Sequence, residues 1–358
     1  MLSDGRIWLK PLRKMACPSC GLVCHAGAMT DASVREFYNA DYSLGAAPGT
    51  ADLVRNVAYA GFVADFVAHG KIRRVLEIGS GSGQVLSRLA DRFPEAEFVG
   101  LEAAEQLSCR QFDNTGVTIH HGFIEDLPPT ADPYDFVYSI KVIEHAADPV
   151  RFLKAVHRQL APDGRVLMIC PADRPPNLEL LFQDHISSFS HAAFSRLAVE
   201  AGFHVLASLP HLEAFPGFQA FLLGKAGAAD AKEPDAVLQA EDGHLAEVVT
   251  YLKAWQRLDG TLLFRLAGSP HTRIFGAGEM AALLRCYAPR FWQTVQAVVV
   301  DETTGCRDLG LPVVATDQLQ PDSKPLVLAV HPRGQRAVSK RLRAVGFNVV
   351  HFDDVIPR

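Results

Sequence analysis

The chain has 358 residues, of which 48% are hydrophobic and 21% are charged, and its formal net charge is −5. This composition is typical of a folded globular protein, and the length favours two domains over a single core. The acidic balance excludes the basic surface that nucleic acid or an anionic membrane requires. The sequence contains no run of about 18 apolar residues, so no membrane span is predicted.

The N-terminal region is predicted to be a short segment with a cysteine motif. It lacks the apolar core and the small-residue cleavage site of a signal peptide, and seven cysteines are too few for a disulfide framework, so we expect a reducing, cytoplasmic location. Cys17 and Cys20, followed by Gly21, form a C-x-x-C turn typical of a zinc knuckle. Zinc needs four ligands, and Cys24 and His25 are poorly spaced to complete the set. A zinc site and a metal-free packed turn both stay open.

Residues 73–225 alternate between apolar segments and helical patterns. Strands are predicted at 73–79, 96–102, 117–122, 134–140 and 164–170, and a helix at 149–160. Continuous apolar strands that alternate with helices favour a parallel sheet covered on both faces. Two more strands, at 203–212 and 217–227, are joined by a short turn, so we expect an antiparallel hairpin at one edge of the sheet.

The remainder of the chain predicts a second, smaller α/β domain. Residues 224–243 are rich in Ala, Gly and Asp and are typical of a linker or an exposed helix start. An amphipathic helix follows, and strands alternate with helices again from Thr272. We therefore predict an N-terminal segment (1–45), an α/β domain (46–225), a linker with a helix (226–270) and a Rossmann-like domain (271–358).

The stretch VLEIGSGSGQ, residues 75–84, ends a predicted strand with an acid and three glycines on alternate residues. Glycines let the backbone approach a ligand, and the next helix directs its N-terminal amides there. A dinucleotide fingerprint, G-x-G-x-x-G, needs its third glycine at position 84, which is Gln84. The spacing is instead E-x-G-x-G-x-G, formed by Glu77, Gly79, Gly81 and Gly83. The Glu77 carboxylate suits a cationic ligand and would repel a diphosphate.

This motif resembles motif I of the class I S-adenosylmethionine-dependent methyltransferases, and three further motifs follow in the family's order. Glu102 ends the next strand, where a carboxylate can accept hydrogen bonds from both ribose hydroxyls, as it also does in nicotinamide enzymes. Residues 120–128 resemble the loop beside the adenine, with Phe123 in place of the usual aspartate, and residues 134–149 resemble the fourth strand with its Glu-His pair. The resemblance, over about residues 50–225, implies that S-adenosylmethionine is bound by Glu77, Gly79, Gly81, Gly83, Gln84, Glu102, Ala103, Ile124, Glu125 and Ser139.

A narrower resemblance concerns the acceptor. DHISSFS, residues 184–190, resembles the EHxxYFS segment of the sugar C-methyltransferases of deoxysugar biosynthesis, whose histidine is regarded as the base. Those enzymes also have a cysteine knuckle, of which the first C-x-x-C is absent before Cys17, and a Rossmann-like C-terminal domain. The resemblance implies C-methylation of a nucleotide-linked keto-sugar, with His185 taking the proton from the carbon beside the ketone and Asp184 orienting the imidazole. A substrate-orienting or a structural role for His185 stays open.

Other candidates are weaker. His145, next to Glu144, faces the methyl donor in the resembling family, although a buried structural pair is equally consistent. Tyr38 and Tyr42 resemble the family's aromatic lid, and Tyr42 is the preferred closing residue, with simple packing as the alternative.

The C-terminal domain has its own glycine motif. Gly276, Gly278 and Ala281 form G-x-G-x-x-A after a strand, with Asp301 at the end of the next, a pattern that alone is typical of a dinucleotide site. The resemblance implies instead a domain that shapes the substrate cleft, so nucleotide-sugar contact, an architectural role and NAD binding remain open. For the whole chain, O- or N-methylation of a sugar or other small molecule and a catalytically silent nucleotide-binding protein are the alternatives.

Overall fold

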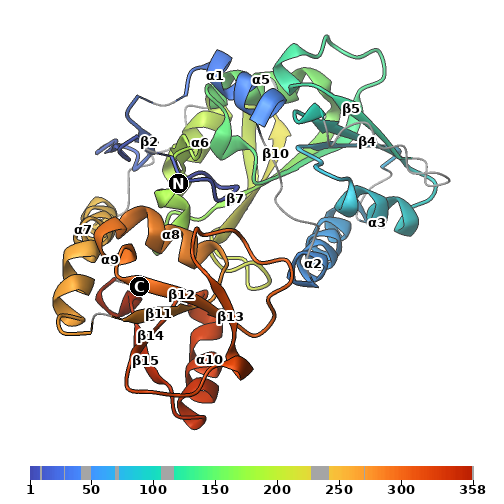
Figure 1. Ribbon diagram of the computed structural model, residues 1–358. Helices are drawn as coiled ribbons and strands as arrows, with labels where there is room; N and C mark the ends of the chain where they lie inside the picture. Colours follow the sequence, from blue (N-terminus) through green and yellow to red (C-terminus); the bar gives the residue numbers. More distant parts are fainter. Residues whose placement is uncertain are drawn as a thin grey trace. The chain divides into compact units, whose positions relative to one another are not determined.

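The computed structural model describes residues 1–8, 10–27, 29–41, 50–68, 72–105, 117–226, 242–269 and 271–356. The chain divides into two compact units (Figure 1). The larger unit comprises Leu12–Leu180 and Asp184–Leu245, and the smaller unit comprises Met1–Pro11, Leu181–Gln183 and Ala246–Arg358. This division differs from the predicted boundaries, because almost all of helix α7 (His244–Arg265) and the first eleven residues belong to the smaller unit.

A seven-stranded sheet forms the centre of the larger unit, with the strand order β5-β4-β3-β6-β7-β10-β9. The parallel strands are β3 (Arg74–Ile78), β4 (Glu97–Glu102), β5 (Val117–His121), β6 (Tyr134–Ile140) and β7 (Leu160–Pro171). Strands β9 (Phe203–Leu209) and β10 (Phe218–Lys225) are antiparallel and form one edge. The predicted α/β fold, a mostly parallel sheet with an antiparallel edge hairpin, is confirmed.

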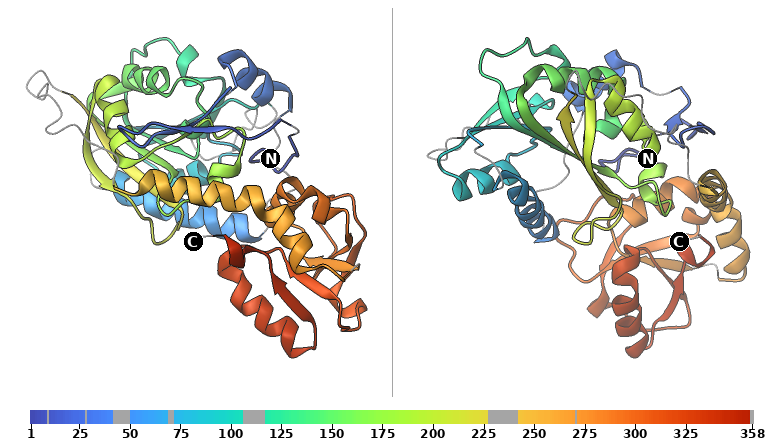
Figure 2. Two further views of the ribbon diagram at one scale, coloured as in Figure 1. Left: turned by 90° about the vertical axis from the view of Figure 1, so that its left-hand side faces the viewer. Right: turned by 180° about the vertical axis from the view of Figure 1, so that it is seen from behind.

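Helices cover both faces of this sheet (Figures 1 and 2). On one face Leu76 and Ile78 pack with helices α5 (Pro149–Gln159) and α6 (His191–Glu200). On the other face Val75 packs with helices α2 (Thr50–Val67) and α3 (Gln84–Arg92). Since successive strand residues point to opposite faces and both faces of the inner strands are buried, β3, β4 and β6 are almost continuously buried. Strand β5 at the edge of the sheet alternates instead between buried and exposed residues.

Helix ends in the larger unit follow from local sequence. Asp148 caps α5 by accepting a hydrogen bond from the Arg151 amide at 2.9 Å, and Pro149 occupies the first turn. Ser190 caps α6 in the same way, accepting from the Ala193 amide at 3.0 Å. The Ser190 cap fixes where α6 begins, directly after the segment that carries Asp184 and His185.

The N-terminal hairpin belongs to the larger unit. Strands β1 (Lys14–Ala16) and β2 (Val23–His25) pair with each other, and β2 pairs with β8 (Ser187–Ser188). Between β1 and β2 the amide of Gly21, at a φ of 76°, donates to the carbonyl of Cys17 and closes a tight turn. Helix α1 (Asp31–Glu36) and a π-helical turn, η1 (Phe37–Asp41), follow. The hairpin is therefore joined by sheet hydrogen bonds to the segment next to His185.

The smaller unit has a five-stranded parallel sheet, with the strand order β13-β12-β11-β14-β15. Its strands are β11 (Thr272–Phe275), β12 (Val295–Val300), β13 (Val313–Ala315), β14 (Pro325–Leu328) and β15 (Asn348–His351). Besides α7, its helices are α8 (Glu279–Tyr287), α9 (Pro289–Trp292) and α10 (Pro332–Ala344). The predicted second α/β domain is thus present. Over the described ranges, no helix is both long enough and apolar enough to cross a membrane.

Candidate functional site

A cavity of about 300 Å³ lies in the larger unit, where the carboxyl ends of β3, β4 and β6 meet. Open parallel sheets bind ligands at this edge. Of the residues predicted to bind the cofactor or to act in catalysis, these line the cavity: Glu77, Gly79, Gly81, Glu102, Ala103, Ile124, Glu125 and His145. Gly83 caps the start of α3, Gln84 is the first residue of that helix, and Ser139 is buried in β6.

The glycine loop needs glycine for two physical reasons. Gly79, Gly81 and Gly83 have φ values of 74°, 54° and 73°, in the left-handed region that L side chains rarely adopt. A Cβ on Gly79 would also lie 2.2 Å from Cγ2 of Val142. The loop is therefore both left-handed and closely packed, and it brings backbone amides to the edge of the cavity.

The Glu102 carboxylate holds this loop from the neighbouring strand. Its Oε2 accepts a hydrogen bond from the Gly81 amide at 2.6 Å, and its Oε1 accepts from the Ala104 amide at 2.8 Å. Burial raises the pKa of Glu102, and the hydrogen bonds from these amides oppose the rise. Each carboxylate oxygen has a further lone pair, so the group can accept from ligand hydroxyls without releasing the loop.

Glu77 is a second carboxylate on the wall of the cavity. It is 3% exposed, and among the described residues its Oε2 has no hydrogen-bond partner. Burial raises the pKa of Glu77 to about 8, and the nearby negative charge of Glu102 contributes to the rise. A buried carboxylate oxygen without a hydrogen-bond partner is costly unless a ligand completes it. The site therefore fits a ligand that carries ribose hydroxyls and a cationic group, as S-adenosylmethionine does.

Aromatic side chains lie along the side of the cavity predicted to hold the adenine. The ring of Tyr38 packs edge to face with Phe123 and with His145, at centroid distances of 6.4 and 6.1 Å. The Arg35 guanidinium lies 4.5 Å from the centre of the Phe123 ring and forms an ion pair with Asp126. These contacts bring the η1 turn to the cavity, and the role of Tyr38 as an aromatic lid stays a prediction. Tyr42, the preferred lid residue, lies outside the described residues.

Two histidines lie together at the next part of the wall. His145 lines the cavity, and its Nδ1 lies 2.9 Å from the carbonyl oxygen of Asp184. The His145 and His185 rings pack edge to face, 4.6 Å apart between centroids. His185 is 5% exposed and is not among the cavity-lining residues, and its Nδ1 lies 3.3 Å from Oε2 of Glu179. The structure therefore brings His145, Asp184 and His185 together, with His145 on the cavity wall and His185 outside it.

The electrostatics of this cluster favour neutral imidazoles. Burial lowers the pKa of His185 well below its usual range, and the positive charges of His145, Lys14 and Lys141 add to that effect. Burial also lowers the pKa of His145. Next to them Glu144 is fully buried, and burial raises its pKa to about 8. Neither Glu144 oxygen has a hydrogen-bond partner within the part of the chain that the structure describes.

Several cavity residues are not among the site residues predicted from the sequence. Arg55, Asn56 and Tyr59 come from helix α2, and Lys141 directly follows strand β6. Lys141 was detectable in principle, because a charged residue just after a buried parallel strand falls at the ligand-binding edge. The α2 residues could not be detected, because the packing of that helix against the sheet depends on contacts between residues that are distant in the sequence.

The cysteine motif gains no support as a zinc site. Among the described residues, two groups of at least three His, Cys, Asp or Glu side chains lie close enough to hold an ion, and neither contains a cysteine. Cys17 and Cys20 thus supply two sulfurs in a tight turn. That turn is instead packed against α6, where the Ser190 hydroxyl donates to the carbonyl of Cys20.

The glycine motif of the smaller unit differs from a dinucleotide site. Arg341 donates to both carboxylate oxygens of Asp301, at 2.8 and 2.7 Å, so the acid expected for a ribose already has a partner. Helix α8 begins with Glu279 after the Gly278 cap, which puts a negative charge where a diphosphate would bind. Both features disfavour NAD at this position.

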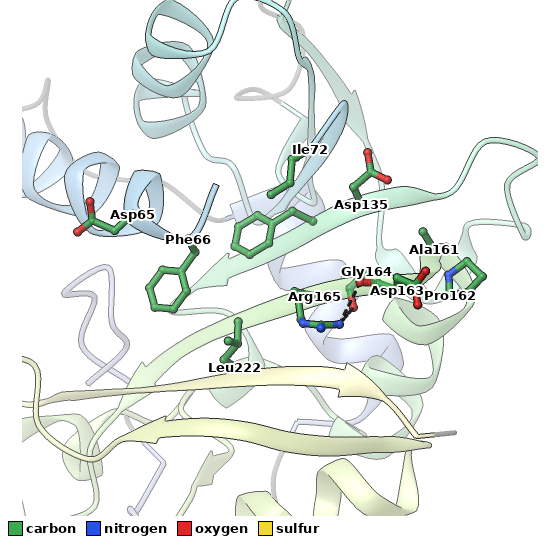
Figure 3. Close-up of a pocket in the computed structure, with 11 residues that line it drawn as sticks. Asp65, Phe66, Ile72, Asp135, Ala161, Pro162, Asp163, Gly164, Arg165 and Leu222 are labelled. Atoms are coloured by element: carbon green, nitrogen blue, oxygen red, sulfur yellow. Dashed lines mark hydrogen bonds between the residues drawn. The ribbon is translucent and has the colours of Figure 1, made fainter. Parts of the chain in front are cut away.

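A second cavity in the larger unit, of about 770 Å³, lies near the amino ends of β6 and β7 (Figure 3). Its wall includes Asp65, Asp135, Asp163 and Arg165. Asp135 already accepts hydrogen bonds from the amides of Arg73 and Arg74. This cavity contains none of the predicted site residues and lies away from the ligand-binding edge.

Comparisons with known proteins agree with this geometry. Residues 52–208 match the family model of a methyltransferase domain. The chain is 37% identical over 102 residues to the ubiquinone biosynthesis O-methyltransferase of Ruegeria pomeroyi, which covers 27% of this chain and 40% of that protein. It is 26% identical over 225 residues to the trans-aconitate 2-methyltransferase of an Acidovorax species, which covers 55% of this chain and 85% of that protein.

A solved structure, that of mitomycin 7-O-methyltransferase, superposes with a TM-score of 0.40 and 24% identity, over 50% of this chain and 55% of that one. The family match lies in the larger unit except for Leu181–Gln183, and the motif residues around the cavity lie in the larger unit. Residues 52–208 are therefore a class I S-adenosylmethionine-dependent methyltransferase domain.

Proposed function

We propose that the whole chain methylates a small molecule, and specifically a carbon of a nucleotide-linked keto-sugar. The observation that carries the proposal is the contact between the His145 and His185 rings at the wall of the cofactor cavity. A carbon acceptor must lose a proton before it can accept a methyl group, so it needs a base at this place. When bound, S-adenosylmethionine supplies the methyl group.

The histidine pair is suited to take up that proton. The Asp184 carbonyl can only accept, so Nδ1 of His145 carries a hydrogen and Nε2 is left as a proton acceptor. His185, the proposed base, is held neutral by burial and contacts His145. In this proposal the proton leaves the acceptor for the imidazole pair, and Asp184 fixes the ring of His145.

The test is a mass-spectrometric screen of nucleotide-sugars with S-adenosylmethionine for a gain of one methylene. When the keto-sugar is deuterated at the carbon beside the ketone, methylation of that carbon additionally requires loss of the deuterium. The proposal is contradicted by a methylated product that keeps the deuterium, because methylation at oxygen needs no such loss.

A second candidate is O-methylation of a small metabolite. The names of two relatives, a ubiquinone biosynthesis O-methyltransferase and a trans-aconitate 2-methyltransferase, favour acceptors that are not nucleotide-sugars. The same screen with phenols and organic acids distinguishes this candidate. A silent nucleotide-binding protein is the third, and it is excluded if any acceptor is turned over.

Two further proposals concern the cellular location of the protein and the role of the smaller unit. We propose a cytoplasmic protein, since Cys17, Cys20, Cys24, Cys170, Cys286 and Cys306 are free thiols. The smaller unit is proposed to contact the nucleotide part of the acceptor or to serve as architecture. Zinc at Cys17 and Cys20 is not part of the proposal.

A further inference from the structure

Lys141 has an unusual backbone for a lysine. It follows β6 directly, and its φ of 60° makes it the single residue other than glycine with a positive φ in the described ranges. Its amide donates to the carbonyl of Ile169 at 2.9 Å, which holds the turn in place. Glycine or asparagine would adopt this conformation more readily. The turn alone therefore does not call for lysine, and a strained residue at a ligand-binding edge indicates a role for its side chain.

The surroundings of the Lys141 side chain locate its charge beside the predicted catalytic residues. Lys141 lines the cavity, and its Nζ lies 4.2 Å from the centre of the Phe218 ring. Its positive charge acts on the pKa values of four buried groups, Tyr59, Glu144, His145 and His185. Within the part of the chain that the structure describes, no carboxylate oxygen lies within 4.0 Å of this ammonium. The charge is thus held near the histidines by an aromatic ring, without an ion pair.

Charged side chains are unevenly distributed on the wall of the cavity, and this distribution indicates what the Lys141 ammonium could bind. Glu77 and Glu102 lie on the glycine-loop side, which suits the cationic cofactor with its ribose. Among the described residues, Lys141 and Arg55 are the Lys and Arg side chains on the wall, and the positive charges of both lower the pKa of Tyr59. Outside the predicted cofactor residues, the wall also carries Asp31, which is ion-paired with Arg35 at 3.0 Å. Lys141 and Arg55 therefore add positive charge to the part of the wall that includes His145.

We infer that Lys141 binds a negatively charged oxygen of the methyl acceptor, next to the atom that is methylated. This inference rests on the proposed function, because it requires an acceptor in this cavity. For a keto acceptor the histidine pair takes the proton, the electron pair of the C–H bond forms the C=C bond of the enolate, and the π pair of the carbonyl moves onto its oxygen. The resulting enolate oxygen is stabilised by the ammonium. When the enolate carbon attacks the methyl group, the carbon–methyl bond forms as the sulfur–methyl bond breaks. The electron pair of that bond stays on sulfur, so the carbonyl is restored and S-adenosylhomocysteine is released. A carboxylate of an organic acid would present the same oxyanion permanently.

The test uses oxalate, a planar dianion that mimics an enolate, and acetate as a simple carboxylate. Each is titrated by calorimetry into the protein saturated with S-adenosylhomocysteine. We expect oxalate to bind, Lys141→Asn to weaken it at least about tenfold, and Lys141→Arg to retain it. Asparagine tolerates the left-handed backbone, so the fold should survive, and the affinity for S-adenosylhomocysteine reports that directly. Lys154→Asn, an exposed position on α5, is the matched control.

The outcomes are distinct. Oxalate bound more tightly than acetate indicates an enolate, and equal binding indicates a carboxylate acceptor; both support the inference. No oxalate binding to the unaltered protein, or equal oxalate affinity in Lys141→Asn, overturns it while leaving the methyltransferase assignment intact. Failure to bind S-adenosylhomocysteine would instead contradict the proposed function itself.

Discussion

The Glu102 carboxylate and the Gly81 amide are joined by a hydrogen bond of 2.6 Å, which connects the end of β4 to the glycine loop after β3. The two residues are 21 positions apart in the chain. Neither the loop nor the acid forms the cavity wall alone. Binding of a ligand to the Glu102 carboxylate is therefore coupled to the position of the amides in the glycine loop.

The first prediction concerns this hydrogen bond. Glu102→Gln leaves one acceptor oxygen where the carboxylate has two. Hydrogen bonds to a charged group contribute about 1.5–3 kcal/mol, so we expect the affinity for S-adenosylhomocysteine to fall about tenfold or more. Calorimetry measures the change. Glu97→Gln, at the exposed start of the same strand, should leave the affinity unaltered. Equal affinities of the two variants would remove Glu102 from the binding site.

The second prediction is a pH dependence of stability caused by Glu77. Its pKa in the folded protein is about 8, above the ordinary 4.5. Below both values the proton is bound in the folded and the unfolded state. As pH rises the unfolded state ionises first, so the contribution to the free energy of unfolding is lost progressively up to about pH 8. In the absence of ligand, Glu77→Gln should therefore gain stability relative to the unaltered protein as pH rises, by about 4 kcal/mol between pH 4 and pH 8.

Urea unfolding of both proteins at the two pH values measures this gain. The same difference in stability at both pH values would show that Glu77 titrates normally. A cationic ligand favours the ionised carboxylate, so the same substitution should weaken S-adenosylmethionine binding.

The third prediction separates steric conflict from backbone strain. Gly79 and Gly217 have φ values of 74° and 93°, but a Cβ would meet Val142 at Gly79 and nothing within 4 Å at Gly217. Alanine at either position incurs a backbone cost of about 1–2 kcal/mol. We expect Gly79→Ala to cost about 1–3 kcal/mol more than Gly217→Ala and to weaken cofactor binding. Chemical denaturation compares the two, and equal losses would mean that Val142 moves aside freely.

The fourth prediction concerns the histidine pair. Because burial depresses the pKa of His185 well below its usual range, its imidazole stays neutral throughout the physiological range. Turnover should then show no loss from His185 protonation until pH falls well below about 6.5. His185→Gln should lower turnover about 10²–10⁴-fold while the affinity for S-adenosylhomocysteine is kept. Full activity of this variant would exclude His185 from the mechanism.

The sequence predicted best what local chemistry determines. Glu77 and the glycines form one short motif, and Glu102 follows from the end of the next strand, so their meeting at one edge could be inferred from strand order alone. The position of His145 on the cavity wall, with His185 outside it, could not be predicted from the sequence. It depends on how the segment before α6 packs against the turn after β6. Arg55 and Tyr59 reach the cavity only through the docking of α2, which no local pattern encodes.

The most direct test of the central claim is calorimetric titration of the intact protein with S-adenosylhomocysteine and, separately, with NAD. The charge and spacing of Glu77, Glu102 and the glycine loop predict one bound equivalent of S-adenosylhomocysteine, which is lost in Glu102→Ala, and no NAD binding that depends on Glu102. Binding of NAD that is abolished by Glu102→Ala, with no heat from S-adenosylhomocysteine, would contradict the account.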